Sequence, residues 1–331
     1  MKKASWWRKS EQTVICELCP HRCKISENRY GLCQARYVKN GVLYSLVYGK
    51  PVAVHIDPIE KKPLYHFYPG SDILSIGTIG CNLFCTFCQN WDIARAKPED
   101  IPARYVSPEE IESTVQQSDV IGVAFTYNEP TIFGEYVVDI SRLVKSRGYK
   151  TVMVSNGFIT PEAVKDIYPL IDAANIDLKA FSNDFYRKEC KGQLTPVLDA
   201  LVEIKKQGTF LEITTLVIPG LNNMEHDIDR MTRWIVENLG KETPYHISAF
   251  YPSYQMKHIH RTTKSELDFV KNIADSNGLQ YVYEGNIMTT TESNTYCPSC
   301  GKLLIERRGY RTVNNLDKNQ CSCGREIPVE L

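Results

Sequence analysis

The chain has 331 residues, of which 43% are hydrophobic and 24% charged, with 39 basic and 39 acidic side chains. Because the charges balance, the chain has no net positive charge that would attract nucleic acid or an anionic membrane. We therefore expect neither as a partner. The N-terminal stretch lacks the apolar run of a secretory signal, and no segment approaches the length that spans a bilayer. We therefore expect a cytoplasmic protein, in which 12 cysteines indicate metal sites rather than disulfides.

The first predicted unit, residues 1–70, carries four cysteines in the stretch CELCPHRCKISENRYGLC. They are Cys16, Cys19, Cys23 and Cys33. Strand-like alternation follows at residues 44–48 and 52–56. Four thiolates suit a zinc ion or an auxiliary iron–sulfur cluster, and the spacing leaves both interpretations open.

A strand-like apolar run at residues 73–79 leads directly into Cys81, Cys85 and Cys88. Three thiols this close together are unsuited to a disulfide, and a structural zinc site takes four ligands in two separated pairs. Three thiolates do suit an iron–sulfur cluster. Because one iron of a cubane would then have no protein ligand, a small molecule can coordinate and react there.

From residue 72 onward, apolar runs alternate with amphipathic helical stretches. The predicted strands are 73–79, 120–125, 151–155, 173–178, 211–218 and 245–250. Helix starts are indicated at Ser107, Thr160, Asn222 and Thr263. This alternation predicts an α/β fold with a parallel sheet, a partial (β/α)6 TIM-like barrel over residues 71–290. In such barrels the chemistry gathers at the C-terminal ends of the strands.

Eight candidate site residues lie on or just after these predicted strands: Asn128, Glu129, Ser155, Asn156, Asp177, Lys179, Val217 and His246. The amide and carboxylate after the second strand suit the amino group of an amino-acid-like cofactor. The opposite charges after the fourth strand are two residues apart and share one side of the strand, although an isolated ion pair is the alternative. The histidine on the sixth strand would face either the barrel interior or the helices.

The last predicted unit, residues 291–331, has two cysteine pairs on either side of a hairpin at 303–313. These ligands are Cys297, Cys300, Cys321 and Cys323. Two cysteine pairs, each followed by Gly and separated by a hairpin, are typical of a zinc ribbon. Metal binding would supply folding energy that so small a core cannot.

The spacing of Cys81, Cys85 and Cys88, with Phe87 between the last two, resembles the radical S-adenosylmethionine superfamily. The resemblance extends to about residue 285. It includes the segments YNEPT, SNG, DLK, HISAFYP, CELCPHRC, GLC and DPIEKKPLYHFYPG. Together they resemble the radical-SAM member of the AmmeMemoRadiSam system, similar to pyruvate formate-lyase activating enzymes. The chain differs from that pattern in lacking the glycines before Glu129 and in having Val154 where the activases carry an aspartate.

The resemblance implies a 4Fe-4S cluster on the three cysteines and S-adenosylmethionine bound beside it. The implied cofactor-binding residues are the three cysteines, Phe87, Asn128, Glu129, Ser155, Asn156, Asp177, Lys179 and Val217. Asp177, Lys179 and His246 are the implied catalytic residues. Reductive cleavage would yield a 5′-deoxyadenosyl radical that removes hydrogen from a substrate. It requires a low-potential donor such as flavodoxin or ferredoxin.

The substrate stays open at this point. One hypothesis is an activase that makes a glycyl radical on a partner protein. Another is an enzyme that works with the Memo-type and AMMECR-type proteins that the family name implies. A third, of another class, is a non-catalytic iron–sulfur and zinc protein for electron transfer or assembly, which would cleave no S-adenosylmethionine.

Overall fold

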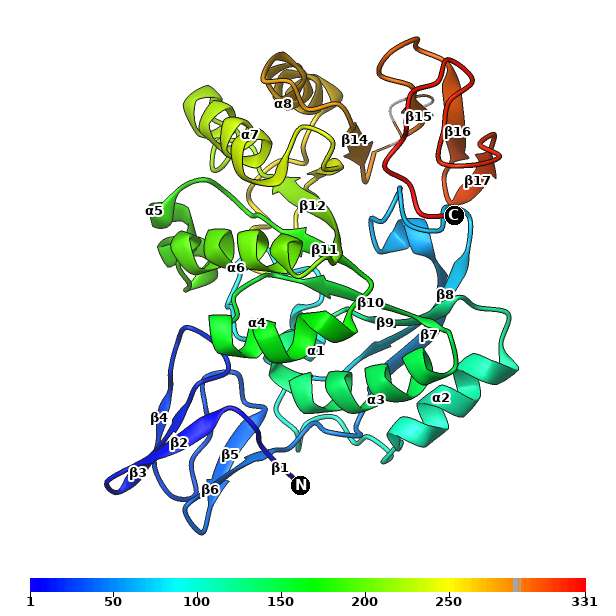
Figure 1. Cartoon of the computed structure of the whole chain (residues 1–331). Helices are drawn as coiled ribbons and strands as arrows, with labels where there is room; N and C mark the ends of the chain where they lie inside the picture. Colours follow the sequence, from blue (N-terminus) through cyan, green and yellow to red (C-terminus); the bar gives the residue numbers. More distant parts are fainter. Residues whose placement is uncertain (288–290, 292) are drawn as a thin grey trace.

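The computed structural model describes residues 1–287, 291 and 293–331, and its centre is one eight-stranded sheet (Figure 1). The spatial order is β14-β13-β12-β11-β10-β9-β8-β7. Its strands are β7 (Ala53–Pro58), β8 (Asp72–Gly77), β9 (Gly122–Phe125), β10 (Lys150–Ser155), β11 (Ala173–Asp177), β12 (Phe210–Val217), β13 (Tyr245–Ala249) and β14 (Val282–Gly285). The strands β8 to β14 are parallel to their neighbours, and β7 pairs antiparallel with β8.

The six strands predicted from apolar runs are present as β8 to β13. The parallel series is one strand longer than the six predicted, because β14 adds to β13. The segment predicted as a strand at 52–56 is β7, which pairs with the edge of the central sheet rather than with the N-terminal strands. The sheet therefore begins before residue 71.

Helices in the connections lie along the outside of the sheet (Figure 1). They are α1 (Trp91–Arg95), α2 (Pro108–Gln117), α3 (Gly134–Ser146), α4 (Pro161–Ile167), α5 (Asn183–Phe185), α6 (Leu194–Lys206), α7 (Glu225–Leu239) and α8 (Lys264–Ser276). Short 3-10 turns are η1 (Ile59–Lys61), η2 (Pro130–Phe133) and η3 (Tyr168–Leu170), and η4 (Tyr186–Cys190) is a π-turn. Their apolar faces and the strands form one large buried core.

Three predicted helix starts are confirmed by cap geometry. Ser107, Thr160 and Thr263 each accept a backbone N–H of the first turn, as N-cap residues do. The fourth is wrong, because α7 is preceded by Met224. Asn222 instead accepts from the backbone of Ile218 and holds the turn after β12.

Two small units flank the central sheet. The N-terminal strands are β1 (Lys2–Lys3), β2 (Trp7–Ser10), β3 (Thr13–Cys16), β4 (Lys24–Ile25), β5 (Arg36–Lys39) and β6 (Val42–Ser45), in two three-stranded sheets. The C-terminal strands are β15 (Thr295–Tyr296), β16 (Leu303–Arg308) and β17 (Arg311–Asn314), and β16 and β17 form the predicted hairpin. Backbone hydrogen bonds between Tyr68, His66 and Glu330 attach the tail to the segment between β7 and β8.

Candidate active site

The cysteine loop follows β8 and is fastened to α1 by one arginine. Arg95 donates from Nη2 to the backbone carbonyls of Leu83, at 2.5 Å, and Cys81, at 3.3 Å. Its guanidinium also stacks on the ring of Phe84, 4.1 Å from the centroid. A planar, always charged group can satisfy several loop carbonyls at once, so Arg95 holds the loop conformation.

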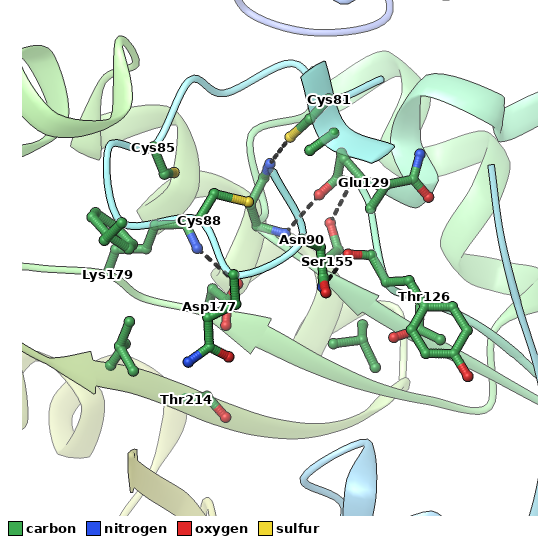
Figure 2. Close-up of a pocket in the computed structure, with 18 of the residues that line it drawn as sticks. Cys81, Cys85, Cys88, Asn90, Thr126, Glu129, Ser155, Asp177, Lys179 and Thr214 are labelled. Carbon is green, nitrogen blue, oxygen red and sulfur yellow. Dashed lines mark hydrogen bonds and ion pairs between the residues drawn. The ribbon is translucent and has the colours of Figure 1, made fainter. Parts of the chain in front are cut away.

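An open cavity of about 570 Å³ lies at the C-terminal ends of the parallel strands. Ten of the residues predicted as site residues line it: Cys81, Cys85, Phe87, Cys88, Asn128, Glu129, Ser155, Asn156, Asp177 and Lys179. Figure 2 shows the three cysteines on one loop, with Glu129, Ser155 and Asp177 on neighbouring strand ends. Residues far apart in the chain therefore meet where a parallel α/β sheet places its chemistry.

Three cysteines line this cavity, and its lining holds no fourth thiol among the described residues. The thiol of Cys190 lies behind them, buried against Cys85, and its hydrogen bond together with burial raises the pKa of Cys85. Burial likewise raises the pKa of Cys88, to about 11. This donor set fits a cubane with three protein ligands and one open iron.

Glu129 is a fully enclosed carboxylate that ties three segments together. Its oxygens accept from Thr131 N at 2.9 Å, Ser155 Oγ at 2.8 Å and Asn156 N at 2.8 Å. Burial raises the pKa of Glu129, and these donors oppose that effect. Glu129 also lines the cavity, so its carboxylate forms part of the wall that a ligand would contact.

Two asparagines brace the cysteine loop from behind. Asn156 donates from Nδ2 to Asn82 Oδ1 at 2.9 Å and lies 3.7 Å from Cys81 Sγ. Asn128 accepts from Thr78 N at 3.0 Å and donates to Gly80 O at 2.9 Å. Both amides are thus engaged with the loop, so they position the cysteines.

Asp177 and Lys179 form an ion pair on the cavity wall, with Oδ2 and Nζ 2.8 Å apart. Burial disfavours the charged form of Lys179, but the adjacent carboxylate outweighs it and raises the pKa of the ammonium. The Asp177 side chain is 35% exposed, so it is accessible from the cavity. The ammonium lies 5.9 Å from the centre of the Phe87 ring.

Two predicted site residues lie outside the cavity. Val217 is out of phase, because Thr214 and Leu216 of the same strand line the cavity, and side chains alternate along a strand. His246 is buried below this layer, where its Nε2 lies 2.5 Å from Glu212 Oε2 and its ring packs on Tyr65. Its position places His246 in a buried polar network and away from the cavity that would hold the cofactor.

Other lining residues were not predicted: Lys61, Lys62, Gln89, Asn90, Ala94, Thr126, Tyr127, Val154, Thr214, Leu216 and Ser248. Lys62 is buried and paired with Asp57 at 2.6 Å, and Tyr127 Oη donates to the same carboxylate at 2.5 Å. Burial disfavours ionisation of Asp57, but the two lysines and the tyrosine outweigh it and lower the pKa of Asp57 well below its usual range. Within the described part of the chain, Thr214 Oγ1 has no hydrogen-bond partner.

The cysteines of the other two predicted metal sites lie near one another in each case. Cys297 Sγ and Cys323 Sγ are 3.6 Å apart, Cys300 Sγ and Cys321 Sγ are 3.7 Å apart, and all four could hold a metal ion. The four N-terminal cysteines line a separate small cavity beside Arg36.

Comparison with known proteins agrees with this site. The model of the Radical SAM superfamily matches residues 75–235. Uncharacterized protein MJ0808 of Methanocaldococcus jannaschii is 40% identical over 336 residues, covering 100% of both chains. MJ1227 of the same organism, provisionally named a glycyl-radical enzyme activating enzyme, is 24% identical over 178 residues, covering 51% of this chain and 70% of the relative.

Among solved structures, Streptococcus suis SuiB bound to S-adenosylmethionine has a TM-score of 0.51 at 12% identity, covering 64% of this chain and 51% of that chain. At this identity the likeness shows the fold alone. Within the described part of the chain, no helix combines the length and apolarity that crossing a membrane requires. The chain belongs to the same family as MJ0808, and its residues 75–235 match the Radical SAM superfamily.

Proposed function

We propose that this protein cleaves S-adenosylmethionine reductively and uses the resulting 5′-deoxyadenosyl radical to remove hydrogen from a substrate. The observation that carries the proposal is the three-thiol lining of a cavity that also contains Glu129 and the Asp177–Lys179 pair. Cys81, Cys85 and Cys88 would hold a 4Fe-4S cluster, which supplies one electron at low potential and an open iron.

The polar residues of the cavity would orient the bound cofactor. Glu129 lines the cavity as a carboxylate and would accept from the ammonium of the methionine part. Asp177 is partly accessible and paired with Lys179, so it can accept from a sugar hydroxyl while the lysine fixes its direction. Thr214 adds a hydroxyl that no described residue pairs with. Holding sulfonium and substrate in a fixed geometry is the main contribution that the protein makes to such a reaction.

A second candidate is the activase reaction, in which the hydrogen comes from a glycine of a partner protein. Its support is the relationship to MJ1227 and to the (2S)-3-sulfopropanediol dehydratase activating enzyme of Klebsiella oxytoca, which is 23% identical over 119 residues. In that case the partner would present a peptide loop to the cavity. Electron paramagnetic resonance of a mixture with a candidate partner would show a glycyl radical.

We propose further components of the system. The electron comes from a low-potential protein donor such as flavodoxin or ferredoxin, and the ribbon cysteines bind zinc. Memo-type and AMMECR-type proteins are proposed partners on the sequence resemblance alone, and copurification from the native cell tests them.

The test is the yield of 5′-deoxyadenosine from anaerobically reconstituted, dithionite-reduced protein, with zinc and iron counted on the same sample. We expect product from the wild type, no product from Cys85→Ala, and zinc that depends on Cys300. A protein with a full cluster that yields no 5′-deoxyadenosine, even with candidate partners, contradicts the proposal and favours a non-catalytic electron-transfer protein.

A further inference from the structure

The four N-terminal cysteines and Arg36 line one small cavity, called here the N-terminal cradle. Cys16 ends β3, Cys19 and Cys23 lie in the turn toward β4, and Cys33 precedes β5. The cysteines come from both small sheets, so a bound metal group would join them. Leu32 at the rim is 50% exposed, so the cradle reaches the surface.

The distances between the cysteine sulfurs distinguish a zinc site from an iron–sulfur site. A tetrahedral zinc ion with Zn–S bonds of ~2.3 Å places its sulfurs about 3.8 Å apart. In the described chain, the ribbon cysteines alone form a group whose ligand atoms all lie within 4.8 Å of one another. By that criterion neither the four cradle cysteines nor Cys81, Cys85 and Cys88 form such a compact group. Wider spacing suits a cubane, because each thiolate there binds a different iron.

Arg36 supplies a second, independent observation. It is 1% exposed and donates from Nη1 to Glu135 at 2.7 Å, but its Nε and Nη2 have no hydrogen-bond partner among the described residues. Unpaired buried donors are costly, so a native protein normally satisfies them. An anionic group inside the cradle, with sulfide and thiolate acceptors, would satisfy both donors.

The cradle lies directly behind the cysteine loop of the active site. Asn82 lines the cradle cavity and accepts from Asn156, which reaches Cys81 Sγ. His21 of the cradle wall contacts Asn82 O at 2.7 Å. A Cβ on Gly80 would come within 2.4 Å of Cys33 O, so the two cysteine segments pass each other with no room for a side chain.

We propose that Cys16, Cys19, Cys23 and Cys33 bind an iron–sulfur cluster, and that this cluster passes single electrons from an external low-potential protein donor to the active-site cluster. The second half rests on the proposed function. In each transfer the donor loses one electron, the cradle cluster is reduced and reoxidised, and the active-site cluster gains that electron. The route suits the geometry, because substrate and cofactor would fill the open cavity on the other side of the loop.

The metal is tested in a Cys81→Ala, Cys85→Ala, Cys88→Ala triple variant, reconstituted anaerobically with iron and sulfide. We expect about four irons and four sulfides per chain, a paramagnetic signal on reduction, and zinc only in the ribbon. Two zinc ions and no iron would overturn the assignment. Adding Cys19→Ser and Cys23→Ser to the triple variant should abolish iron binding and keep the ribbon zinc. If this fivefold variant does not fold, the metal content of the triple variant alone tests the assignment.

The reduction potential of the cradle cluster tests the role of Arg36, because a merely structural residue would leave that potential unchanged. In the triple variant, Arg36→Met should lower the reduction potential of the cradle cluster, because a cation that donates hydrogen bonds stabilises the more negative reduced form. Arg36→Lys keeps the charge and should shift the potential less. Equal potentials in all three proteins would contradict the assignment of Arg36 to the cluster.

The electron route is tested with Cys19→Ser, Cys23→Ser on intact active-site cysteines. Dithionite is small enough to reduce the active-site cluster directly, so its 5′-deoxyadenosine yield should persist. The yield with reduced flavodoxin should fall by roughly tenfold or more. Undiminished flavodoxin-driven cleavage would overturn the relay and leave the proposed function standing. If the wild type cleaved no S-adenosylmethionine, the proposed function would be contradicted. The iron count of the triple variant would still support a cluster in the cradle.

Discussion

The side chain of Asn156 donates to the side chain of Asn82 at 2.9 Å and so links the wall of the active-site cavity to the N-terminal cradle. Asn82 also contacts the segment after β10, because its Nδ2 donates to Phe158 O at 2.6 Å. The asparagine is 0% exposed, so no water replaces these partners. One buried amide thus holds the cysteine loop against the segment after β10.

Replacing Asn82 by alanine should loosen this junction. Buried partners left unpaired cost about 1–3 kcal/mol, so we expect that loss in the free energy of unfolding and a slower cleavage of S-adenosylmethionine. Urea unfolding and the rate of 5′-deoxyadenosine formation measure the two effects. Asn238→Ala, on the exposed side of α7, is the control and should change neither. Equal behaviour of the two variants would contradict a positioning role for Asn82.

Replacing Cys190 by alanine should leave the active-site cluster intact. Cys190 is buried beside Cys85 but does not line the cavity, so three thiolates remain for the iron. We expect unchanged iron content and cleavage, whereas Cys85→Ala loses both. If Cys190→Ala lost iron to the same degree as Cys85→Ala, a four-thiolate cluster without an open iron would replace our account.

Replacing Glu129 by glutamine should weaken S-adenosylmethionine binding. The amide removes the charge and presents an NH₂ group where the carboxylate now accepts from backbone N–H groups. Losing a hydrogen bond to a charged group costs about 1.5–3 kcal/mol, which is roughly a 10- to 100-fold rise in Kd. Equilibrium binding to the reconstituted protein measures it, with Glu109→Gln on the exposed face of α2 as control. Unchanged affinity would remove Glu129 from the cofactor site.

Acidification should destabilise the packing of the tail through His66. Burial lowers the pKa of His66 to about 4, while Glu212 opposes the shift and Arg307 and His246 add to it. Between the unfolded pKa of about 6.5 and pH 4, the unfolded chain binds the extra proton, so stability falls as pH falls. The loss totals about 3 kcal/mol for this group.

Urea unfolding at pH 7 and pH 5 measures that dependence. His66 Nε2 lies 2.5 Å from Tyr283 Oη, and His66→Gln can keep a hydrogen bond there without titrating. We expect a smaller difference between the two pH values in the variant. A pH dependence equal to that of the wild type would assign the effect to other groups.

Much of the site could be predicted because parallel strands bring their C-terminal ends together. Ser155 and Asp177 end strands that apolar runs already indicated, Glu129 follows another such strand, and all three line the cavity. Val217 does not line the cavity, and its position has a physical cause. Both faces of β12 are buried, so the run from 211 to 218 carries no alternation to show which side chains face inward.

The remaining residues depend on contacts that no local pattern encodes. Lys62 lines the cavity with its ammonium paired to Asp57 of β7, and β7 lies there because it pairs antiparallel with β8. His246 forms a buried pair with Glu212, which lies 34 positions earlier in the chain. This contact between distant residues could not be predicted from the sequence around His246. The choice between zinc and iron in the cradle depends on sulfur separations, which the spacing of cysteines in the chain does not determine.

The central claim is that S-adenosylmethionine binds the open iron held by Cys81, Cys85 and Cys88. The most direct measurement is electron–nuclear double resonance on the reduced protein with S-adenosylmethionine carrying ¹³C in its carboxylate. We predict a ¹³C coupling to the cluster in the wild type and in Cys190→Ala. A reduced, fully loaded active-site cluster that shows no such coupling at saturating S-adenosylmethionine would contradict the account.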